Sequence, residues 1–98
     1  MKQGRVAKQV EEASRGIFAA EEQIRTLTEQ LATWEEMRED LHVRALVSET
    51  PQAAAELSGI ERQCDIAKAA ISEQQVRKSN FERLMEDLMI EWKPEVAS

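Results

Sequence analysis

Residues 6–34 read VAKQVEEASRGIFAAEEQIRTLTEQLATW, and this stretch decides the fold. Apolar or small residues recur in it at alternating intervals of four and three positions, and the spacing continues as far as Ala45 with Arg38 as its one interruption. The repeat covers roughly five to six heptads, more than the three or four that indicate a coiled coil. We therefore predict a long helix over residues 4–47 with one apolar stripe, the seam. Its members are Val6, Val10, Ala13, Ile17, Ala20, Ile24, Leu27, Leu31, Trp34, Leu41 and Ala45.

A second seam of the same kind follows in residues 51–92 and predicts a second helix there, before a short tail over 93–98. Two successive seam positions carry Gln74 and Lys78, which weaken the stripe locally. Lys78 can lay its methylenes along the seam and keep its ammonium in water. The apolar or small members are Ala53, Leu57, Ile60, Cys64, Ala67, Ile71, Phe81, Met85, Leu88 and Trp92.

The two halves are separated by Ser48-Glu49-Thr50-Pro51, with a turn expected at about 48–50. Proline suits the first position of a helix, and the residue before it is pushed toward the extended conformation of an N-cap. Pro51 inside one continuous helix would cost about 3 kcal/mol. We therefore expect Thr50 to cap the second helix and the chain to reverse. The predicted fold is all-α: a two-helix antiparallel coiled-coil hairpin formed by a single domain of residues 1–98.

The reversal also predicts which seam residues meet. Seam residues whose numbers sum to about 98 face one another, so that Ile17 meets Phe81 and Trp34 meets Cys64. Large residues then mostly oppose small or medium ones, as interdigitated packing requires. A hairpin swapped between two chains would keep every seam contact, so both forms stay open.

The charge of the chain disfavours two classes of partner. Its 19 acidic and 13 basic residues give a net charge of −6, and the basic residues are dispersed along the sequence. A phosphate backbone or an anionic membrane surface would be repelled, which also disfavours a DNA-contacting tip. No apolar run is long enough to cross a bilayer, and the N-terminus lacks an apolar signal core. We expect a cytoplasmic protein with no nucleic-acid partner and no membrane insertion.

Catalytic and metal-binding chemistry is poorly supported. The single cysteine, Cys64, cannot form an internal disulfide, and its seam position suits a small buried hydrophobe. Glu39 and His42 have the spacing of di-iron bundles, but the seam turns Glu39 outward and leaves only one such pair. The chain has no glycine-rich phosphate loop and no Ser/His/Asp set. We expect no enzyme activity, no metal and no cofactor.

Apolar residues gathered at the two ends of the predicted hairpin are the candidate partner contacts. At the open end they are Phe18, Leu84, Met85, Leu88, Met89 and Trp92, and at the turn end they are Val43, Leu46 and Val47. The open end would either join two hairpins in a four-helix bundle or offer a groove to a partner helix. The turn end would either fold over the start of the second helix or form a recognition tip.

These features favour a non-enzymatic interaction or scaffold module that acts through coiled-coil self-association, as a four-helix bundle or a larger helical assembly. The alternative is a small acidic chaperone or adaptor that holds a client protein's helix, for example in export or filament assembly. In that case, the weak seam at Gln74 and Lys78 would be where the client helix enters.

Overall fold

The computed structural model describes residues 2–92, and the side chains of residues 4–91. The chain forms two helices, α1 over Lys2–Ser48 and α2 over Pro51–Trp92. α2 occupies the residues predicted for the second helix, while α1 begins two residues before and ends one residue after its predicted range. Neither helix has a stretch apolar enough to cross a membrane.

The end of α1 is marked by a residue in the left-handed conformation. Glu49 has a φ of 49°, and its N–H donates a hydrogen bond to the carbonyl of Ala45 at 3.1 Å. A left-handed residue directly after a helix is usually glycine, because a side chain there crowds the following carbonyl. The chain therefore reverses at some cost in backbone strain.

The start of α2 has the predicted cap. The Thr50 hydroxyl oxygen accepts a hydrogen bond from the N–H of Ala53 at 3.1 Å, and the Thr50 carbonyl accepts one from Ala54 at 3.2 Å. Pro51 is the first residue of the helix, where it has no N–H to satisfy. The roles predicted for Thr50 and Pro51 are confirmed.

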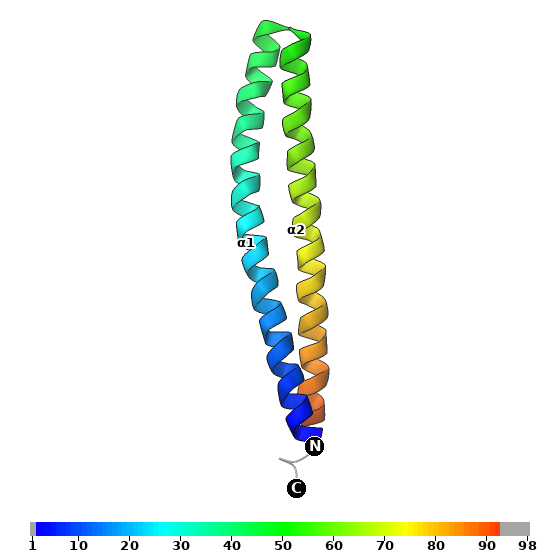
Figure 1. Cartoon of the computed structure of the whole chain (residues 1–98). Coiled ribbons are helices and arrows are strands. Elements are labelled where there is room, and N and C mark those ends of the chain that lie inside the picture. The colour runs from blue at the N-terminus through cyan, green and yellow to red at the C-terminus, as the bar shows by residue number, and fades with distance from the viewer. Residues whose placement is uncertain (1, 93–98) are drawn as a thin grey trace. The chain divides into compact units, whose positions relative to one another are not determined.

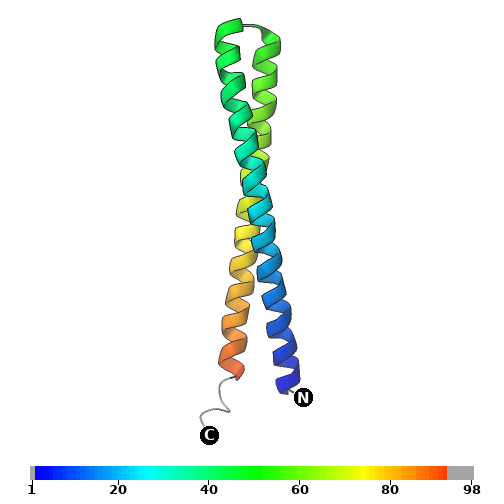
Figure 2. The same ribbon diagram turned by 90° about the vertical axis from the view of Figure 1, so that its left-hand side faces the viewer.

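The described residues pack as two units, each with a segment of both helices. The turn unit is Ile24–Ser72 and contains the reversal, and the terminal unit pairs residues 2–23 with residues 73–92. Within each unit, α1 and α2 lie side by side and run in opposite directions (Figures 1 and 2). The predicted all-α antiparallel hairpin is confirmed.

The core of both units is narrow and made mostly of small side chains. Ala13, Ala20 and Leu88 are buried in the terminal unit, and Cys64 and Ala67 are buried in the turn unit. Every other predicted seam position between residues 6 and 88 is half-buried, including the polar positions Arg38, Gln74 and Lys78. The heptad pattern thus identified the contact face correctly, although it did not show how few large residues would be fully enclosed.

One close approach in the terminal unit requires glycine. The Phe81 ring lies so close to α1 that a Cβ built on Gly16 would be 2.6 Å from its Cζ atom. Gly16 neighbours Ile17, the residue predicted to face Phe81, so the contact agrees with the predicted register. By contrast, a Cβ on Gly59 would meet nothing within 4 Å.

This difference predicts opposite roles for two helical glycines. Gly59→Ala should raise the free energy of unfolding by about 1 kcal/mol, the usual gain when alanine replaces glycine in a helix. Gly16→Ala should be at least about 1 kcal/mol less stable than Gly59→Ala, because the Phe81 ring must leave its place. Urea denaturation at one protein concentration measures the free energy of unfolding of both variants. Equal stabilisation by the two alanines would contradict the close contact between Phe81 and Gly16.

The strained turn predicts a stabilising substitution. Glu49→Gly should raise the free energy of unfolding by about 0.5–1 kcal/mol, since relief of the left-handed strain exceeds the added flexibility of the unfolded chain. Glu36→Gly, at an exposed position inside α1, is the matched control and should lower stability by about 1 kcal/mol. Thermal unfolding followed by circular dichroism compares the two. A loss of stability in both variants would show that position 49 carries no strain.

Candidate protein-interaction surfaces

The narrow core leaves many large apolar side chains in solvent. Among the described residues they are Phe18, Met37, Val43, Leu46, Val47, Ile66, Val76, Leu84, Met89 and Ile90. Six of them were predicted from sequence as partner contacts, and a seventh, Ile90, directly follows the predicted Met89. Met37, Ile66 and Val76 were not identified, because each lies off the seam and away from the two ends. Scattered apolar residues are normal on a protein surface, so the informative ones are those that share a groove.

Four predicted contacts at the open end differ in how much surface they offer. Phe18 is 64% exposed, and Met89 is also exposed. Met85 is half-buried, whereas Leu88 is 6% exposed and belongs to the hairpin's own core. The side chain of Trp92 lies outside the described residues. Leu88 therefore has little surface left for a partner.

A groove in the terminal unit brings together part of this set. It has a volume of about 790 Å³ and is lined by Ile17, Glu82, Met85, Glu86, Met89 and Ile90; we call it the terminal groove. The five α2 residues recur at the spacing of one helix face, so the groove follows α2. Ile17 and Met85 are half-buried, and the other four residues are exposed. The groove thus combines an apolar base with carboxylates.

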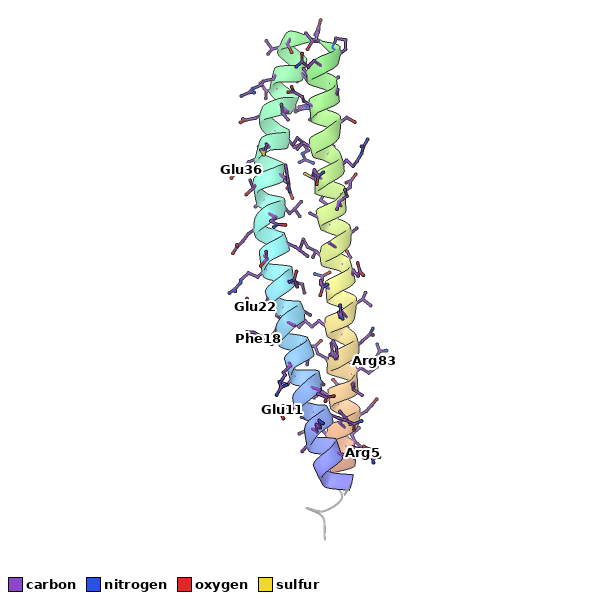
Figure 3. All side chains as sticks on the ribbon, viewed as in Figure 1. Arg5, Glu11, Phe18, Glu22, Glu36 and Arg83 are labelled. Atoms are coloured by element: carbon purple, nitrogen blue, oxygen red, sulfur yellow. The ribbon has the colours of Figure 1, made fainter. Side chains whose placement is uncertain are left out.

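Phe18 does not line the terminal groove. Its side chain lies on the outer side of α1, away from α2, as do those of Glu11 and Glu22 (Figure 3). Glu11 is paired with Arg15 at 2.8 Å. The open-end residues predicted to form one cluster therefore lie on separate surfaces.

Lys78, one of the two polar residues in the second seam, forms an ion pair with a residue of α1. Lys78 Nζ lies 3.2 Å from Glu21 Oε2, and the two side chains are 32% and 51% exposed. The sequence predicts an ammonium in water at this position but does not predict a carboxylate on α1 as its partner. At such exposure the ion pair contributes at most about 1 kcal/mol. The Gln74 and Lys78 segment is therefore bridged, although it remains weak.

A second groove lies on the turn unit, and we call it the turn groove. Its lining is Trp34, Met37, Asp40, Leu41, Arg44, Glu56, Gly59, Ile60 and Gln63, around a volume of about 570 Å³. Gly59 carries no side chain, which helps to keep this face open. An adjoining hollow beside the turn shares Leu41, Arg44 and Glu56 and adds Val43, Val47 and Ala53. The rim, unlike that of the terminal groove, carries both signs of charge.

The tip of the hairpin is uncovered. Leu46 and Val47 are 66% and 80% exposed, so the start of α2 does not fold over them. Val43 and Val47 instead line the hollow beside the turn groove. The three residues predicted at the turn end are all available for contact.

The residues considered for chemistry differ in exposure. Cys64 is a free thiol, 2% exposed and enclosed by the turn unit. Glu39 and His42 are both exposed and line a shallow hollow with Arg38, Leu57 and Glu61. No group of three or more potential metal ligands occurs among the described residues.

Comparison with known proteins gives no functional information about this chain. Inference about function therefore rests on the surfaces described above for residues 2–92. No family model, no curated protein and no solved structure matches this chain.

Proposed function

We propose that this protein is a non-enzymatic interaction or scaffold module whose hairpins self-associate. The observation that supports the proposal is the imbalance between core and surface. Five hydrophobic residues are buried among the described residues, and four of them are alanine or cysteine, whereas ten large hydrophobic side chains are exposed. Each large apolar side chain fully removed from water contributes about 1.5–3 kcal/mol. Docking of one hairpin on another would recover part of this free energy.

The turn groove is the surface that best suits a second copy. Its base is apolar, with Trp34, Leu41 and Ile60, and the exposed Met37 lies at its edge. A twofold pair brings the same surface of both copies together, so the surface must be complementary to itself. Arg44 of one copy could then face Asp40 or Glu56 of the other. Two hairpins joined in this way would form a four-helix arrangement.

A second candidate function is supported by the terminal groove. A small acidic chaperone or adaptor needs an exposed apolar groove that can receive a helix, and methionine side chains adapt to partners of different shape. Met85 and Met89 both line the terminal groove. This function and self-association through the turn groove use separate surfaces, so the two are compatible.

Self-association predicts a dimer or larger assembly at micromolar concentration. Met37→Glu should weaken association by about tenfold or more, because a carboxylate would be placed against an apolar base. Ala32→Glu adds the same charge at an exposed position of α1 that does not line the groove. It should change the association constant by less than about twofold. Sedimentation equilibrium measures all three proteins.

A wild-type chain that stays folded and monomeric at tens of micromolar would overturn the proposal. Equal weakening by Met37→Glu and Ala32→Glu would remove the turn groove as the surface involved. Circular dichroism of each variant shows whether its helices are intact.

A further inference from the structure

We propose that the terminal groove binds a basic amphipathic helix of another protein. The inference deepens the adaptor function given above by naming the chemistry of its partner. It does not rest on self-association, which was assigned to the turn groove. It stands on three observations of the terminal unit: the apolar base, the direction of the groove and the sign of its charge.

The apolar base accounts for affinity. Ile17 from α1 and Met85 from α2 are half-buried, and Met89 and Ile90 extend the apolar surface into solvent. Burial of such residues under a partner is favourable in proportion to the area removed from water. Two methionines in one groove suit partners that differ in side-chain shape.

The direction of the groove accounts for the kind of element that would bind. Its α2 residues occupy positions 82, 85, 86, 89 and 90, which form one face over more than two helical turns. A partner helix presents apolar side chains at the matching intervals of three and four residues. An extended strand would bond through its backbone, and a helix such as α2 has no free backbone edge to receive it.

The charge of the groove selects the partner. Glu82 and Glu86 are exposed and line it, and no basic side chain does so among residues 4–91. Arg83 lies on the outer side of α2 (Figure 3). Lys78, four residues before Glu82, is paired with Glu21. The whole chain also carries a net charge of −6. Lysine or arginine residues flanking the apolar face of a partner helix would therefore be attracted.

The same charge argues against a second copy as the occupant. Twofold docking through the terminal groove would place Glu82 and Glu86 opposite the same carboxylates of the other chain. Like charges facing each other across an interface disfavour that pairing. The turn groove avoids this conflict, because Arg44 lines it together with Asp40 and Glu56.

The test uses the methionine methyl groups of the full chain. Among the four methionines, Met85 and Met89 line the terminal groove and Met37 lines the turn groove. The protein is labelled with 13C at the methionine methyls, and Met37→Leu, Met85→Leu and Met89→Leu assign their signals. The probe is a synthetic 18-residue amphipathic helix of leucine and lysine, and its counterpart with glutamate in place of lysine is the charge control.

The proposal predicts saturable shifts of the Met85 and Met89 signals with the lysine peptide, an unchanged Met37 signal, and no saturation with the glutamate peptide. Glu82→Gln/Glu86→Gln should weaken peptide binding about fivefold, as expected for the loss of two exposed ion pairs. Glu29→Gln/Glu36→Gln makes the same charge change at exposed sites of the turn unit and should weaken it less than about twofold.

The proposal would be overturned by the absence of a saturable shift at Met85 and Met89, by equal binding of both peptides, or by equal weakening by the two glutamine pairs. Shifts of Met85 and Met89 with protein concentration alone would also overturn it, since a second copy would then occupy the groove. A concentration-dependent Met37 signal reports on self-association separately. The two proposals can therefore fail independently.

Discussion

The close packing of α1 against α2 along one narrow seam is the interaction on which the rest of the structure depends. Ala13, Ala20, Cys64 and Ala67 are buried there, and small side chains let the helices approach closely. Gly16 provides space for the ring of Phe81 in the same way. Two helices cover each other on only one face, however. The packing that forms the hairpin therefore leaves ten large apolar side chains outside the seam exposed among the described residues.

Part of that remaining surface lies in two grooves of different charge. Both have an apolar base, but Arg44 lies with carboxylates on the turn groove, while Glu82 and Glu86 are the charged residues that line the terminal groove among the side chains described. Because hydrophobic attraction is not directional, charge decides which partner each groove favours. A self-complementary rim suits another copy of the chain, and an acidic rim suits a basic helix.

The hairpin could be predicted from sequence because its signals are local and periodic: the heptad repeat fixes the contact face, and Thr50-Pro51 fixes the reversal. The left-handed Glu49 was not predictable, since glycine or asparagine is the usual residue there. The surfaces were predicted only in part. Met85 and Met89 do line one groove, but Phe18 lies on another side, and Met37 was overlooked. A groove forms where side chains from both helices come together, as those of Ile17 and Met85 do in the terminal groove. The heptad pattern of one helix does not predict which side chains of the other helix will lie beside it.

A spin-label distance shows whether each chain folds back on itself. Nitroxides at Thr28→Cys and Lys68→Cys, both exposed in the turn unit, are placed in a Cys64→Ala background and diluted with unlabelled protein. The intrachain hairpin predicts a distance below about 30 Å between the two labels, because packed helix axes lie about 8–10 Å apart. In one continuous helix the 40 intervening steps would span about 60 Å. A distance near that value, or a short distance that dilution abolishes, would contradict the intrachain hairpin.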